Sequence, residues 1–171
     1  MSIVNSHNDW DPLEEIFVGI ADHARIPTVD ASTHSFGFAD CKWEDIKDLE
    51  GPSPQWVIDE ANEDLDNLSK TLENLGVKVR RPKAIDHSKT FKSLDWETTG
   101  WYTYCPRDLL LPLDNLIIDC PGAMRARQYE TVAYRDFLYE VVDEGGEWLA
   151  APRPRLLDSS YQLDDLSIST L

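Results

Sequence analysis

A proline turn at residues 105–108 places two oppositely charged side chains side by side, and these groups suit the recognition of small charged molecules. The segment reads Cys105-Pro106-Arg107-Asp108, and an apolar run follows directly. A carboxylate at the beginning of a strand can face a cleft and accept two parallel charge-assisted hydrogen bonds from a planar guanidinium. An aspartate here can equally form the turn by bonding to its own backbone. Both interpretations of Asp108 stay open from spacing alone.

Two further arginines, Arg125 and Arg127, lie at the beginning of a predicted helix after Pro121-Gly122. They could bind the carboxylate of a ligand, or they could pair with acidic side chains of the chain itself. The sequence holds 32 acidic and 16 basic residues, and this excess of acid favours structural pairing.

The remaining reactive residue types form no pattern of their own. We expect the three cysteines to be free thiols, because an odd, small number does not suggest a disulfide framework. The four histidines are too widely spaced for a metal site, and no glycine-rich phosphate loop is present. We therefore expect no metal and no nucleotide cofactor, and we expect His87 to be a surface residue. The cysteines are Cys41, Cys105 and Cys120, and the histidines are His7, His23, His34 and His87.

An aromatic cluster precedes the turn at 105–108. It could line a pocket, since clefts are often aromatic, or it could be core between two structural units, and core is the favoured interpretation. Its members are Trp96, Trp101, Tyr102 and Tyr104.

The amino-acid composition excludes some classes of partner and indicates a globular protein. The formal net charge of −16 over 171 residues argues against a nucleic-acid or anionic-membrane partner. An apolar content of 42% is typical of a globular chain. No targeting segment and no run long enough to span a membrane is visible, so we expect a cytoplasmic protein.

The pattern of apolar residues predicts an α/β fold. A strand is expected at 13–20, and a long excursion fills 22–53. A helix is expected after Ser53-Pro54, with Ser53 as its N-cap. Its apolar positions recur at spacings of three and four, it ends at Gly76, and a strand follows at 77–80.

The second half repeats this order. Strands are expected at 108–113 and 116–119 around Asp114-Asn115, a helix at about 123–142, and a strand at 148–150. Strand–helix–strand units of this kind cannot cover their apolar faces alone, so they usually stack on neighbours.

The stretch from Gly100 to Arg127, which contains Cys105-Pro106-Arg107-Asp108 and ends in Met124-Arg125-Ala126-Arg127, resembles the amidinotransferases. This is the family of glycine amidinotransferase and inosamine-phosphate amidinotransferase. The resemblance extends from about residue 8 to 165. It implies a pentein-like α/β-propeller of five units, of which this chain would hold about two, at 8–88 and 95–165, as the N-terminal part of a single domain.

The resemblance also implies an activity. The family moves an amidino group from arginine to an amine such as glycine, giving ornithine and guanidinoacetate as in creatine synthesis, through an amidino-cysteine intermediate and without a cofactor. It implies that Asp108 holds the substrate guanidino group, and Arg107 and Arg127 are further candidates for substrate binding. The family's nucleophilic cysteine, its histidine base and the aspartate that orients this base match no position here, so no catalytic residue is assigned. The resemblance therefore implies that Cys41, Cys105 and Cys120 are packing residues. The turn Asp119-Cys120-Pro121-Gly122 departs from the family's Glu-Ala-Pro-like turn.

We therefore expect residues 1–171 alone to be inactive, and to require a missing C-terminal half or to form a homo-oligomer. The alternative is a non-catalytic, shortened relative that acts as a binding or assembly module. Guanidine hydrolysis is a third interpretation that fits the motifs less well.

Overall fold

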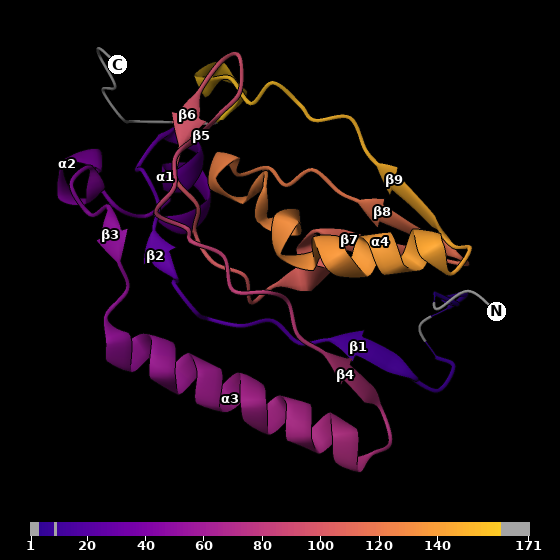
Figure 1. Cartoon of the computed structure of the whole chain (residues 1–171). Helices are drawn as coiled ribbons and strands as arrows, with labels where there is room; N and C mark the ends of the chain where they lie inside the picture. Colours follow the sequence, from indigo (N-terminus) through magenta and orange to yellow (C-terminus); the bar gives the residue numbers. More distant parts are fainter. Residues whose placement is uncertain (1–3, 9, 162–171) are drawn as a thin grey trace.

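The first structural unit is a parallel pair of strands covered by one long helix (Figure 1). The computed structural model describes residues 4–8 and 10–161. Strand β1 (Glu15–Phe17) pairs in parallel with β4 (Lys78–Arg80), and helix α3 (Gln55–Asn74) connects them. The expected strand at 13–20 is therefore shorter, although the chain continues beside β4 through a hydrogen bond from Val18 N to Arg80 O.

Helix α3 ends as the sequence predicts but begins differently. Gly76 has φ +86°, a conformation that glycine adopts at no steric cost, and it closes the helix by donating to Glu73 O. At the other end Pro54 is the capping residue. The prediction that Ser53 caps the helix is wrong, because the chain bends one residue later and the proline fixes the entry angle.

The excursion at 22–53 contains ordered elements. Strands β2 (Arg25–Ile26) and β3 (Gly51–Pro52) pair antiparallel at its two ends, which keeps the excursion compact. Two helices lie between them, α1 (Ala31–Gly37) and α2 (Trp43–Ile46). Asp30 caps α1 by accepting a hydrogen bond from Thr33 N.

The second unit is a three-stranded sheet with its own helix. Strands β7 (Leu110–Leu113) and β8 (Leu116–Asp119) form an antiparallel hairpin, and β8 pairs in parallel with β9 (Glu147–Ala150). Helix α4 (Arg135–Asp143) makes the crossover. A small hairpin of β5 (Phe91–Lys92) and β6 (Glu97–Thr98) lies between the two units along the chain.

The expected helix at 123–142 is wrong in its first half. Two 3₁₀ turns, Arg125–Arg127 and Glu130–Tyr134, precede α4. Both arginine side chains are buried and held by groups from distant segments, and such tertiary contacts override local helix propensity.

The main core lies between α4 and the sheet of the second unit, and the first unit packs against its border. The ring of Phe17 on β1 makes edge contacts with Tyr134 and Phe137, at centroid distances of 5.2 and 4.7 Å. Beside it, Arg80 on β4 donates to both carboxylate oxygens of Glu140 at 2.7 and 2.8 Å. One face of the β1–β4 pair thus packs on the helix of the second unit. Among the described residues, no helix has the length and apolarity needed to cross a membrane.

Candidate functional site

Asp108 lies in a short turn that leads into β7 of the second unit, with its carboxylate only partly covered. It is the last residue of the 3₁₀ turn Pro106–Asp108, two residues before β7. Its side chain is 39% exposed. One oxygen, Oδ2, accepts a hydrogen bond from Arg127 Nη1 at 2.6 Å. The other, Oδ1, lies 3.6 Å from Arg107 Nε, which is too far for a hydrogen bond.

Arg127 holds the carboxylate of Asp108 in place. Its guanidinium is buried and donates to Glu130 Oε2 at 2.6 Å, to Glu130 Oε1 at 3.2 Å and to Cys105 O at 3.1 Å, besides Asp108. Its Cζ lies 4.8 Å from the ring centroid of Tyr102, a cation–π geometry. The planar fork of the arginine therefore orients Asp108 through a rigid network.

Glu130 is the member of this network that sequence reasoning missed. Its side chain is 2% exposed, and a buried carboxylate is stable only when it is paired and hydrogen-bonded. The available signal was the spacing of three between Arg127 and Glu130, which brings side chains together in a helical turn.

Charges and burial set the protonation of this cluster. The hydrogen bond from Arg127 lowers the pKa of Asp108 below its usual value, so this carboxylate is ionised at neutral pH. Burial raises the pKa of Glu130 to about 7, and the Arg127 guanidinium opposes that rise. Burial also raises the pKa of the Cys105 thiol, which disfavours a thiolate at this position.

The structure brings the three predicted site residues together around Asp108. Arg127 is hydrogen-bonded to Asp108, whereas Arg107 lies at ion-pair distance from it and its side chain is 95% exposed. The pairing interpretation of Arg125 and Arg127 is confirmed. Arg125 donates to Asp158 Oδ1, to Asp30 Oδ2 and to Leu156 O, so it joins the excursion to the chain after β9.

Three expectations about single residues need correction or refinement. His87 is buried, not on the surface, and bonds Thr103 Oγ1 at 2.8 Å through Nε2. All three cysteines are free, but Cys41 is exposed and is not a packing residue. The aromatic cluster is divided, since Tyr102 and Tyr104 stack at 3.9 Å beside Arg127 whereas Trp96 lines a separate hollow.

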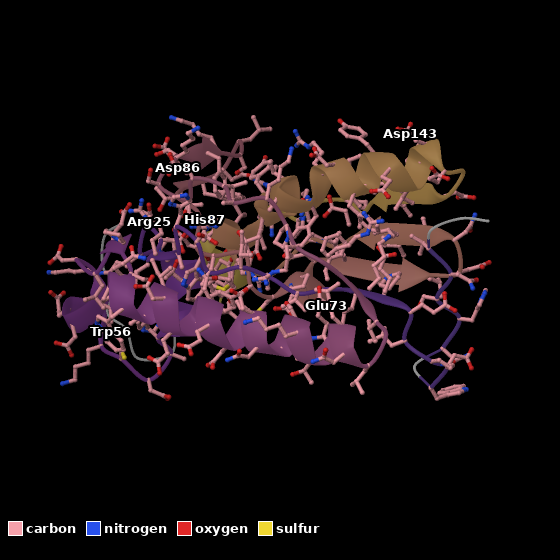
Figure 2. All side chains as sticks on the ribbon, turned by 60° about the horizontal axis from the view of Figure 1, so that its bottom comes forward. Arg25, Trp56, Glu73, Asp86, His87 and Asp143 are labelled. Atoms are coloured by element: carbon pink, nitrogen blue, oxygen red, sulfur yellow. The ribbon has the colours of Figure 1, made fainter. Side chains whose placement is uncertain are left out.

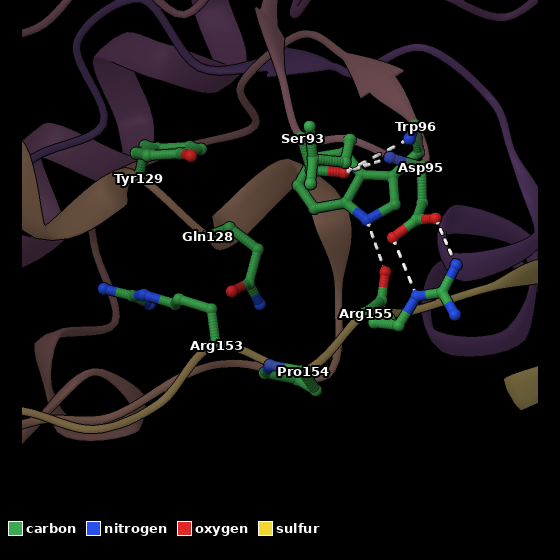
Figure 3. A pocket seen from close by; sticks show the side chains of 9 residues that line it. Ser93, Asp95, Trp96, Gln128, Tyr129, Arg153, Pro154 and Arg155 are labelled. Atoms are coloured by element: carbon green, nitrogen blue, oxygen red, sulfur yellow. Dashed lines mark hydrogen bonds and ion pairs between the residues drawn. The ribbon is translucent and has the colours of Figure 1, made fainter.

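Two hollows lie outside this cluster. One of about 180 Å³ is walled by Trp96, Tyr129 and Arg153, and the Arg155–Asp95 ion pair lies at its rim (Figure 3). The other, of about 290 Å³, lies beside the beginning of α3 and includes Arg25 and Asp86. Figure 2 shows these two residues and His87 toward the same end of the molecule as Trp56 of α3. In the described part of the chain, no three His, Cys, Asp or Glu side chains gather in a way that could hold a metal ion.

Comparison with known proteins shows to which proteins this chain is related. Inosamine-phosphate amidinotransferase 1 of Streptomyces griseus is 47% identical over 161 residues, covering 94% of this chain and 46% of that protein. Its solved structure matches with a TM-score of 0.88. This chain is a homologue of the amidinotransferases. No protein-family model matches it.

The relationship extends across amidinotransferases with different names. The L-arginine:L-lysine amidinotransferase of Pseudomonas savastanoi pv. phaseolicola is 40% identical, covering 94% of this chain and 44% of that protein. The mitochondrial glycine amidinotransferase of Xenopus laevis is 37% identical, covering 94% and 38%. The chain thus spans about half the length, or less, of the curated relatives it matches. Its fold is a partial α/β-propeller of the pentein type, with about two of five units.

Proposed function

We propose that this chain forms the guanidinium-binding wall of an amidinotransferase that takes an amidino group from arginine and passes it to an amine such as glycine. The observation that carries the proposal is the carboxylate of Asp108. Arg127 holds one oxygen and keeps the group ionised, while the other oxygen makes no short contact with Arg107. A guanidinium is the ligand that such a preoriented carboxylate binds best.

The proposed roles follow from the contacts. Asp108 accepts hydrogen bonds from the guanidino group of arginine and orients its central carbon for attack. Arg127 is a positioning residue that acts through Asp108, because its own donors are engaged inside the protein. Arg107, whose side chain is exposed, is proposed to lie near the substrate carboxylate.

The chemistry itself is assigned to groups outside this chain. In the proposed reaction a cysteine thiolate attacks the guanidino carbon, ornithine leaves with a proton, and the acceptor amine then displaces the sulfur, which divides one difficult substitution into two easier ones. Cys105 is not proposed as the nucleophile, because burial raises its pKa. A cytoplasmic location stays a prediction, since the matched glycine amidinotransferases are described as mitochondrial.

A fused protein tests the proposal. Residues 1–161 of this chain replace the matched part of the S. griseus relative, and ornithine release from arginine is measured. Asp108→Asn keeps the size of the side chain but removes its charge, and a hydrogen bond to a charged group contributes roughly 1.5–3 kcal/mol. We expect kcat/KM for arginine to fall roughly tenfold to a hundredfold.

Arg107→Lys is the matched control, because it keeps the neighbouring charge and should lower kcat/KM less. Equal kcat/KM for the fused protein and its Asp108→Asn variant, at equal folded fraction, would contradict the proposed role of Asp108.

A further inference from the structure

The guanidinium of Arg127 is shared unequally between two carboxylates. Glu130 accepts two hydrogen bonds from it, from Nε to Oε2 at 2.6 Å and from Nη2 to Oε1 at 3.2 Å. Asp108 accepts one, from Nη1 to Oδ2 at 2.6 Å. Two parallel bonds from one edge of a guanidinium form a stronger pair than a single bond does. Glu130 is therefore the principal partner of Arg127, and Asp108 is bound to it through one oxygen.

The two carboxylates also differ in their access to a ligand. The side chain of Glu130 is 2% exposed, whereas that of Asp108 is 39% exposed. A ligand from solution can thus contact Asp108 but not Glu130. Glu130 acts on such a ligand through Arg127 and through its own charge, which water and salt screen little at a buried position.

The charges of this network do not cancel. One guanidinium, on Arg127, and two carboxylates, on Asp108 and Glu130, leave one negative charge in excess. Without Glu130, the pair of Arg127 and Asp108 would be neutral and would attract a cation only weakly. The side chain of Arg107 is 95% exposed, so water and salt screen its charge.

The other titratable groups beside Glu130 add no charge to the network. Burial raises the pKa of each of these phenols and of the thiol, so they are uncharged at neutral pH. Among the described residues they are Tyr102, Tyr104, Cys105 and Tyr134. The net charge of the buried network therefore depends on Glu130.

We propose that Glu130 supplies the net negative charge by which the guanidinium-binding wall attracts a cationic donor. It neutralises Arg127 and so leaves the charge of Asp108 to the substrate. Without the charge of Glu130, a substrate guanidinium would compete with Arg127 for a single carboxylate. Glu130 is a positioning residue that does not touch the substrate. This inference rests on the proposed function and names the residue that gives the wall its charge.

Protonation of Glu130 should weaken the attraction. Burial raises the pKa of Glu130 to about 7, so this carboxylate loses its charge as pH falls through that value. The network then carries no net charge. A bound cation favours the ionised form of a nearby carboxylate, and linkage is reciprocal. Arginine should therefore bind more tightly above pH 7 than below it.

The test measures kcat/KM for arginine from pH 5.5 to 8.5 in the fused protein described above. Glu130→Gln resembles the protonated glutamate in shape, so the ratio of kcat/KM between the parent fused protein and this variant removes the titrations that both share. We expect this ratio to be near one at pH 5.5 and to rise to about ten at pH 8.5, as for the interaction of unit charges in a partly buried site. The change should appear in KM rather than in kcat, because the charge acts on substrate binding.

Two further variants serve as controls. Glu130→Asp keeps the charge on a shorter side chain, so it should restore part of the kcat/KM that Glu130→Gln loses at pH 8.5. Asp143→Asn also removes one carboxylate, but this residue is exposed at the far end of α4 (Figure 2). Its ratio should stay near one at every pH. Melting curves establish that the compared proteins are folded.

A second measurement needs no variant and applies even if Glu130→Gln does not fold. Carbon-13 NMR of the Glu130 carboxyl group in residues 1–171 gives its pKa with and without arginine. We expect arginine to lower this pKa, because a bound guanidinium favours the ionised carboxylate. A pKa that arginine leaves in place would contradict the proposal.

The kinetic outcomes separate this inference from the proposed function. An equal loss of kcat/KM at all pH values would show that Glu130 only maintains the structure. Unchanged kcat/KM of Glu130→Gln at pH 8.5 would show that its charge does not reach the ligand. If Asp108→Asn lowers kcat/KM in the same experiment, the proposed function stands although this inference fails. If Asp108→Asn has no effect either, both fail.

Discussion

Arg127 contacts most of the charged groups of the candidate site. Its replacement therefore tests whether these groups form a rigid network. Arg127→Lys keeps the charge, but an ammonium lacks the planar fork that reaches Asp108, Glu130 and Cys105 O together. A buried carboxylate that loses part of its pairing costs about 1–3 kcal/mol. We expect a loss of that size in the free energy of unfolding, measured by urea denaturation. Arg107→Lys should change it by less than about 0.5 kcal/mol, and equal losses would contradict the network.

His87 should make the stability of the protein sensitive to acid. Burial lowers its pKa from 6.5 to about 4. Between these values the unfolded chain binds a proton that the folded protein does not, so stability falls as pH falls. Glu130, whose pKa is raised, acts in the opposite direction from about pH 7 downward, so the comparison must isolate the histidine. We expect His87→Gln to show a smaller loss of melting temperature between pH 6.5 and 4 than the unchanged chain. Parallel curves would show that His87 does not titrate in this window.

At the scale of single residues, the sequence pointed to individual positions but not to the contacts between them. Asp108, Arg107 and Arg127 were predicted as separate contacts to a ligand, and whether they bind one stays a prediction. That Arg127 holds Asp108 depends on the 3₁₀ turns that replaced the expected helix, and this local conformation is set by buried partners distant in sequence. The burial of His87 likewise depends on Thr103 and on the close approach of Gly100, which no local pattern reveals.

Among the elements, those with strong local signals were predictable. Helix α3 has an apolar periodicity and a glycine stop, and the hairpin of β7 and β8 turns at Asp114-Asn115, where Asp114 has φ +56°. Asparagine and aspartate tolerate this conformation better than other residues with side chains. The excursion at 22–53 and the short strands β5 and β6 lack such signals, because their few backbone hydrogen bonds become favourable only within the folded molecule.

Strand β1 leads directly into a close crossing of two chain segments, which gives an element-scale prediction. A Cβ at Gly19 would lie 2.6 Å from Thr103 O and closer still to the backbone of Tyr104. Because backbone cannot yield as a flexible side chain does, Gly19→Ala should lower the free energy of unfolding by about 1–3 kcal/mol. Thermal melting measures the change. Gly51→Ala is the control, since no atom lies within 4 Å of its added Cβ; a Gly19→Ala variant as stable as Gly51→Ala would argue against the crossing.

At the scale of the whole molecule, the repeat of strand, helix and strand is what made the fold class predictable. The first unit packs on α4 of the second through Phe17 and Phe137. The sequence contained the repeat, in the two glycine stops and the strands after them, but not this contact between the units. The boundaries of the units at 8–88 and 95–165 stay predictions, and residues 162–165 lie outside the described part of the chain.

The environments of the cysteine thiols predict whether residues 1–171 alone release ornithine from arginine. Asp108 is proposed to orient a guanidinium, but the pKa of Cys105 is raised by burial. The Cys120 thiol lies 3.6 Å from Ile118 O, toward which it donates. Neither is positioned as an activated thiolate. Incubation of this polypeptide with arginine and glycine should therefore release no more ornithine than its Cys105→Ala/Cys120→Ala double variant, while the fused protein serves as the positive control. Ornithine above the level of the double variant would make one of these two cysteines a nucleophile and would move the catalytic centre into this chain.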